Sequence, residues 1–138
     1  MEETTIVVML KNQETGFLEK ELGNYTIEEN LGGMLNIYAQ EAEHGPKAFL
    51  RLSCEKELQD WEYEAIFDYY DTDCMNGVVE SLVEEDEHMN PVWVATFDFL
   101  DHQEQMEEKL SKILSLHAQE LDSVYEVIAD KRDDYIED

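Results

Sequence analysis

Basic residues are scarce in this sequence, and their scarcity limits what the protein binds. Nine Lys and Arg stand against 35 Asp and Glu in 138 residues, which gives a formal net charge of −26. A protein that binds DNA or RNA needs cations to replace the counterions condensed on the phosphates, so direct nucleic-acid binding is excluded. An anionic membrane surface would repel the chain for the same reason. The charge favours a basic protein as the partner.

Cysteine and long hydrophobic runs are also rare. Cys54 and Cys74 are the only cysteines and form no CxxC pair, so we predict two reduced, small core residues. The N-terminal MEETTIVVML has no basic segment, and its apolar run is too short for a signal peptide. No stretch approaches the ~20 apolar residues that a membrane-spanning helix needs. We therefore expect a cytoplasmic protein with no membrane contact.

Signatures of catalysis and metal binding are missing as well. The histidines form no HxH, HxxxH or HExxH pair, and no Ser lies in a GxSxG motif. The acidic run at residues 84–88 offers oxygen ligands to a divalent cation but no defined cage. We predict no catalytic residue, no cofactor and no metal site. His117 lies on an apolar stripe, where a hydrogen-bonded core histidine is expected.

Apolar residues are plentiful despite the charge and make up 43% of the chain, enough for one core. We expect a single domain over residues 1–132 and an acidic tail at 133–138. Apolar and alternating patterns between turn residues predict strands at 4–11, 17–27, 34–42, 47–56 and 61–71. Residues 73–85 favour a short helix, with a strand as the alternative. Residues 90–100 fit a strand or a helix, and the strand is preferred.

The C-terminal third carries the clearest helical pattern. From His102 to Arg132 there is no Gly or Pro, and apolar residues recur at helical spacing. The expected fold is α+β: a mostly antiparallel sheet of five or six strands, with a short helix and this long helix packed on one face. Any part of the apolar stripe left beyond the sheet would serve a homodimer.

The most distinctive stretch is DWEYEAIFDYYDTD at residues 60–73. As a strand, it would place Glu62 and Glu64 ~6.8 Å apart on one face together with Asp68. Ile66 and Tyr70 would add apolar anchors for a partner. The leading hypothesis is a non-enzymatic interaction or regulatory domain that binds a basic partner through these residues.

Three other interpretations compete with that hypothesis. The acidic face would also suit a nucleic-acid mimic or an immunity-type inhibitor of a basic nuclease. A carboxylate-based enzyme that uses a divalent ion is the less favoured option. The simplest interpretation is a half-buried strand whose outer face is solvated.

Two segments, ETGFLEKELG (residues 14–23) and DWEYEAIFDYYDTD, resemble a family of small acidic bacterial proteins of unknown function. The resemblance spans the chain. Its motifs are not catalytic signatures, so it implies no activity for any residue.

Overall fold

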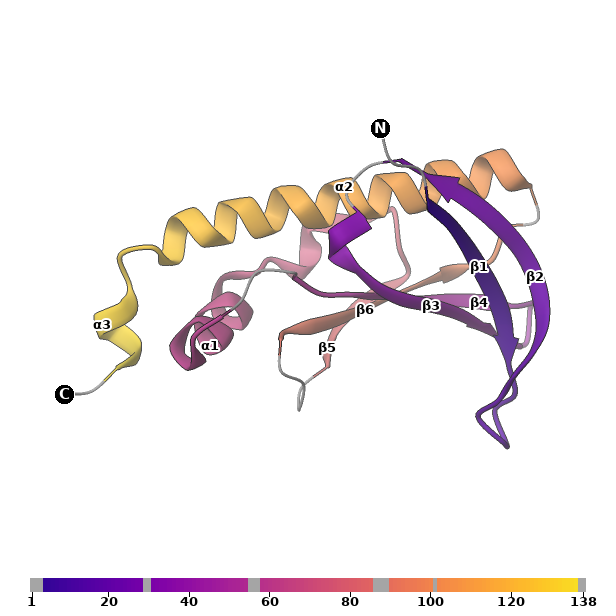
Figure 1. Ribbon diagram of the computed structural model, residues 1–138, viewed down its shortest axis with the longest axis horizontal. Helices are drawn as coiled ribbons and strands as arrows, with labels where there is room; N and C mark the ends of the chain where they lie inside the picture. Colours follow the sequence, from indigo (N-terminus) through magenta and orange to yellow (C-terminus); the bar gives the residue numbers. More distant parts are fainter. Residues whose placement is uncertain (1–3, 29–30, 55–57, 86–89, 101, 137–138) are drawn as a thin grey trace.

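A computed structural model describes residues 4–28, 31–54, 58–85, 90–100 and 102–136 (Figure 1). In chain order its elements are β1 (Thr4–Lys11), β2 (Leu18–Ile27), the 3-10 turn η1 (Leu31–Gly33), β3 (Met34–Gln40), β4 (Lys47–Leu52), α1 (Asp60–Tyr69), the 3-10 turn η2 (Thr72–Met75), β5 (Ser81–Glu85), β6 (Val92–Asp98), α2 (Gln103–Ile128) and α3 (Arg132–Tyr135). The predicted α+β class is confirmed, as are the strands at the N-terminus, the strand at 92–98 and the long helix.

The six strands form one mixed sheet in the order β2-β1-β3-β4-β6-β5. The sheet is mostly antiparallel, as expected, with one parallel pair, and its strand order departs from the chain order at two places. After β2 the chain returns to the far side of β1, so β3 lies parallel to β1. After β4 the chain passes through α1 and η2 to the sheet edge, and the hairpin of β5 with β6 then brings β6 back beside β4.

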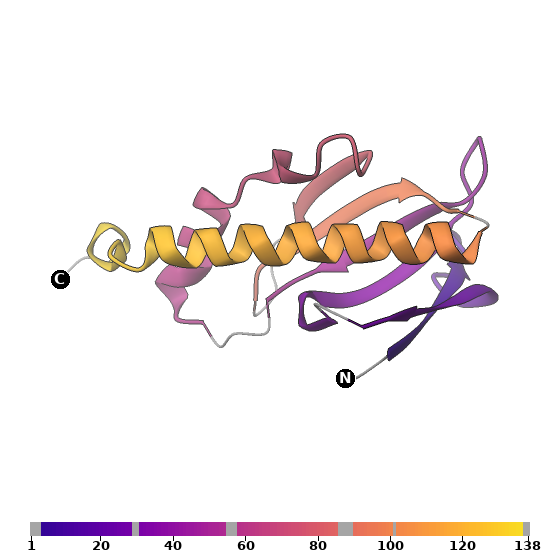
Figure 2. The same ribbon diagram turned by 90° about the horizontal axis from the view of Figure 1, so that it is seen from above.

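Helix α2 lies lengthwise over one face of the sheet, and its C-terminal part extends over α1 (Figures 1 and 2). The alternation predicted for β4 is confirmed, because Ala48, Leu50 and Leu52 are all fully buried beneath the helix layer. The helix contributes its own apolar stripe to the same core: Met106, Leu110, Ile113, Leu114, His117, Leu121, Val124 and Ile128. The core therefore lies between α2 and one face of the sheet.

The prediction of a strand at residues 61–71 is wrong, because residues 60–69 form α1. A capping box starts this helix: the Glu62 side chain accepts a hydrogen bond from the backbone N–H of Gln59, and the Gln59 side chain accepts one in return. The adjacent residues Ala65 and Ile66 are both fully buried. Two consecutive buried residues fit the side of a helix, whereas they would point to opposite faces of a strand.

The helix expected at residues 73–85 is also wrong, and the alternative strand is present as β5. Only Thr72–Met75 is helical, as the 3-10 turn η2. Gly77 then adopts a φ of 85°, a left-handed conformation that glycine accepts readily, and the chain turns toward β5.

Within the segment expected as an acidic tail at 133–138, the described residues include a short helix, α3, at 132–135. Tyr135 donates a hydrogen bond to Asp68 of α1 at 2.6 Å, and its ring lies 6.3 Å from that of Trp61. The end of the chain is therefore attached to α1 through at least residue 135.

Candidate functional site

His117 lies in the middle of α2 and is completely buried. Its Nε2 is 2.7 Å from the carbonyl oxygen of Ser53, which only accepts, so Nε2 carries the hydrogen. Its Nδ1 lies 2.8 Å from the hydroxyl of Tyr70 and therefore accepts a hydrogen bond from it. The prediction of a hydrogen-bonded core histidine is confirmed.

A chain of neutral groups leads from this histidine toward the surface. Burial lowers the pKa of His117 to about 4 and raises the pKa of the Tyr70 hydroxyl far above its usual range. The sulfur of Cys74 lies 3.9 Å from the Tyr70 hydroxyl oxygen, and burial raises the pKa of the Cys74 thiol as well. A thiol with a raised pKa is a poor nucleophile at neutral pH, because the thiolate is the reactive form.

Aromatic and glycine contacts enclose the histidine. The Trp93 ring stacks on Tyr70 with 4.2 Å between ring centroids, and it meets the His117 ring edge-on at 5.3 Å. A Cβ atom on Gly33 would lie 2.9 Å from Cδ2 of His117, so only glycine fits there without displacing the ring. The backbone at this point is held by a hydrogen bond from the Ser53 N–H to the Gly33 carbonyl.

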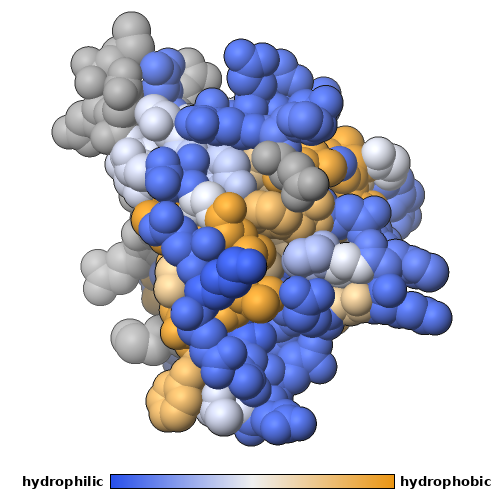
Figure 3. All heavy atoms as spheres, turned by 90° about the vertical axis from the view of Figure 1, so that its right-hand side faces the viewer, coloured by the Kyte–Doolittle hydropathy of each residue, from blue (hydrophilic) through white to orange (hydrophobic). Residues whose placement is uncertain are grey.

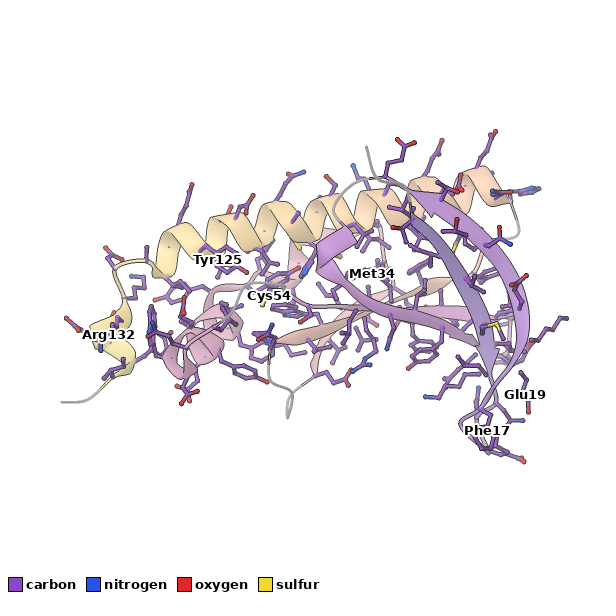
Figure 4. All side chains as sticks on the ribbon, viewed as in Figure 1. Phe17, Glu19, Met34, Cys54, Tyr125 and Arg132 are labelled. Atoms are coloured by element: carbon purple, nitrogen blue, oxygen red, sulfur yellow. The ribbon has the colours of Figure 1, made fainter. Side chains whose placement is uncertain are left out.

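The two cysteines are both thiols, and each neighbours a tyrosine. Cys54 is buried beneath α2 near Tyr125 (Figure 4), and burial together with Cys54 raises the pKa of that tyrosine. Cys74 is half-buried beside Tyr70. The expectation of small core residues is met by Cys54 and only partly by Cys74.

Of the residues predicted to form a partner-binding face, only Glu64 and Asp68 lie exposed on the same side of α1, one turn apart. Ile66 and Tyr70 are buried in the core, so they are not available as anchors. Asp68 accepts the hydrogen bond from Tyr135 of α3. Glu62 belongs to the capping box of α1, and Glu64 lies beside Tyr135 on the exposed side of the helix. The strand spacing that suggested a nucleic-acid mimic is therefore not present.

A different acidic surface lies where the end of β2 meets the first half of α2. It is a groove of about 640 Å³, and its described lining residues are Thr26, Glu28, Glu104, Glu107, Glu108, Ser111, Lys112 and Ser115. Glu107 accepts a 2.6 Å hydrogen bond from the backbone N–H of Thr26 on the free edge of β2. This bond fixes one carboxylate between the strand and the helix, and we call the surface the acidic groove.

Sequence reasoning missed the acidic groove for a physical reason. Glu28 follows β2 and Glu104 begins α2, so the two are remote in the chain and meet only after the helix has packed on the sheet. In a chain so rich in acids, no local spacing marks them out.

Within the described ranges, no three His, Cys, Asp or Glu side chains are arranged to hold a metal ion. The part of the acidic run at residues 86–88 lies outside those ranges. Among the described helices, none combines the length and the apolar character needed to cross a membrane.

A family model matches residues 1–136, and its description is "Family of unknown function (DUF6762)". No curated protein and no solved structure matches the chain.

Proposed function

We propose that this chain, which belongs to the family of unknown function DUF6762, is a non-enzymatic binding domain for a basic partner protein. The observation that carries the proposal is the composition of the acidic groove, whose described lining sets four glutamates against a single base, Lys112. The net charge of −26 adds a long-range attraction for a basic partner.

The groove has the features of a surface prepared for cationic side chains. The Glu107 side chain is already held by its hydrogen bond with the Thr26 backbone N–H, so little side-chain entropy is lost when a partner binds. Glu28, Glu104 and Glu108 lie beside it along the groove. An exposed ion pair contributes about 0.2–1 kcal/mol, so several are needed for useful affinity, and the complex should weaken as salt increases.

The buried cluster around His117 supports a structural role and not a catalytic one. Both ring nitrogens are engaged in hydrogen bonds within the core, and the lowered pKa of the ring keeps it neutral. A general base must reach the proton that it removes from a substrate. His117 is completely buried and has no such access.

Binding of a basic probe to matched variants tests the proposal. The probe is a synthetic peptide of Lys and Arg residues, titrated calorimetrically into the full chain at several salt concentrations. The double variant E104Q/E108Q removes two charges from the groove, and the control D122N/E126Q removes two exposed charges from the far half of α2.

We expect the groove variant to bind the peptide at least about fivefold more weakly than the control, because the glutamates of the groove lie close enough together to contact one peptide at the same time. Equal weakening by both variants would show that overall charge alone attracts the peptide, and would contradict the proposal. Capture of basic proteins from lysate at graded salt would then identify candidate partners.

A further inference from the structure

Helix α2 covers one face of the sheet, and among the described residues no element covers the other, which we call the outer face (Figures 1 and 2). Side chains alternate along each strand, so residues between the buried ones point outward. On the outer face these positions include Val7, Tyr38, Phe49, Val83 and Val94. A face of an antiparallel sheet that is exposed to water normally carries polar side chains. The apolar side chains of the outer face are instead typical of a face that packs against another protein surface.

Apolar residues occur on most strands of the outer face, and we call them together the apolar band. Tyr38 and Phe49 are paired across β3 and β4, and their rings stack with centroids 5.3 Å apart. Val94 of β6 pairs with Val83 of the edge strand β5, and Val83 is 58% exposed. At the other end, Val7 of β1 is 42% exposed.

The band continues onto the hairpin of β1 and β2, where Phe17 and Leu18 are exposed. Figure 3 views the molecule from the end that carries this hairpin and shows hydrophobic residues gathered among hydrophilic ones. Phe17 lies at the tip of the hairpin, away from α2 (Figure 4).

Several charges of the outer face are paired with one another. Lys47 forms ion pairs with Glu80 and with Asp98, the latter at 2.8 Å. Arg51 makes a two-bond contact with Glu85 at 3.0 and 3.3 Å. The Lys11 ammonium lies 4.6 Å from the centre of the Tyr38 ring. Lys11, Lys47 and Arg51 thus offset Glu80, Glu85 and Asp98, so this aromatic part of the outer face is nearly neutral on a molecule of charge −26.

We propose that the outer face is the surface through which two copies of this chain associate. A second copy also carries a charge of −26, so contact through the helix side would bring like charges together. Contact through the outer face avoids that repulsion. Positive and negative side chains lie next to one another on this face, so those of one copy can pair with opposite charges of the second copy across a twofold axis. Two sheets packed face to face at ~10 Å would cover the apolar band.

The apolar stripe of the C-terminal helix, where the sequence suggests a homodimer contact, is not left exposed beyond the sheet. Leu121, Val124 and Ile128, which continue the stripe beyond the middle of α2, are buried within the chain. Val127 is exposed on this part of the helix at 44%, close to the value for Val7. This similarity makes Val127 a matched control.

Sedimentation equilibrium of the full chain in 0.3 M NaCl tests the proposal, since this salt screens the general repulsion. We expect a monomer–dimer equilibrium whose dissociation constant rises at least about tenfold in V83E and in V7E, and changes less than about twofold in V127E. Circular dichroism of each variant checks that the fold is retained.

A wild-type chain that stays monomeric up to millimolar concentration would overturn the proposal. A dimer weakened by V127E and not by V83E or V7E would overturn it too, because it would place the contact on α2. A dimer that none of the three substitutions weakens would likewise show that the contact lies elsewhere.

Discussion

The hydroxyl of Tyr70 donates a 2.8 Å hydrogen bond to Nδ1 of His117 and so joins the C-terminal end of α1 to the middle of α2. The opposite ring nitrogen holds the Ser53 carbonyl just after β4. One buried imidazole therefore connects α1 and α2 to the sheet.

Replacement of Tyr70 by Phe should destabilise the fold by about 1–3 kcal/mol, because Nδ1 of His117 would be left buried without a donor. Tyr63→Phe is the matched control. The Tyr63 hydroxyl is buried and has no hydrogen-bond partner among the described residues, so its removal should leave the stability unchanged or slightly raised. Urea unfolding of both variants measures the difference. Equal losses in the two would show that the bond to His117 contributes nothing.

The pKa of His117 near 4 predicts a defined dependence of stability on pH. Between pH 6.5 and 4 the unfolded chain binds a proton at this residue and the folded chain does not, so the histidine's contribution to stability falls as the pH falls. The full contribution corresponds to about 3 kcal/mol. His117→Gln does not titrate, so the free energy of unfolding of the wild type should fall relative to this variant across that range.

The comparison with His117→Gln is needed because the carboxylates act in the opposite direction. Their protonation below about pH 5 relieves the mutual repulsion of a chain with net charge −26. Parallel pH profiles for the wild type and the variant would contradict the assignment of a neutral buried imidazole.

Gly33→Ala should destabilise the protein by about 1–3 kcal/mol, since the added methyl group would meet the His117 ring at 2.9 Å. A double-mutant cycle with His117→Ala identifies the cause. Once the ring is removed, the cost of the Gly33 substitution should largely disappear. If the cost is the same in both backgrounds, the contact with His117 is not its origin.

Moderate salt should stabilise the fold. Exposed carboxylates repel one another across the surface, and the Debye length falls to ~10 Å at 0.1 M salt. We expect the urea midpoint to rise between about 10 mM and 0.3 M ionic strength. NaCl and choline chloride should act alike, because screening does not depend on the cation's identity. A midpoint that falls or stays constant would mean that favourable ion pairs, such as those of Lys47, outweigh the repulsion.

The longest and most regular patterns are predicted correctly, whereas short stretches that fit both a strand and a helix give correct and wrong predictions: residues 92–98 form the expected strand, and residues 60–69 do not. The stripe of α2 and the alternation of Ala48, Leu50 and Leu52 are long and regular, and both are confirmed. The stretch at 60–69 alternates as a strand does, yet Trp61, Ala65 and Tyr69 also recur every four residues. The burial of Ile66 beside Ala65 decides for the helix, and burial depends on packing that a single sequence does not reveal.

The candidate site shows the same limit. Burial of His117 follows from its place on the apolar stripe, whereas the sequence pattern assigns its partner Tyr70 to a binding face, and nothing local identifies Gly33 as its neighbour. The acidic groove joins Glu28 to Glu104 across the fold. Charge composition predicts only the sign of the charge on the proposed partner, and the groove itself is recognised only in the tertiary structure.

The proposed function is tested most directly by the affinity of a Lys- and Arg-containing peptide for E104Q/E108Q compared with D122N/E126Q, measured at the same salt concentration. Both double variants lose two negative charges, so they differ only in where the charge is removed. We predict binding at least about fivefold weaker for the groove variant. Indistinguishable affinities would contradict the claim that the groove between β2 and α2 is where a basic partner binds.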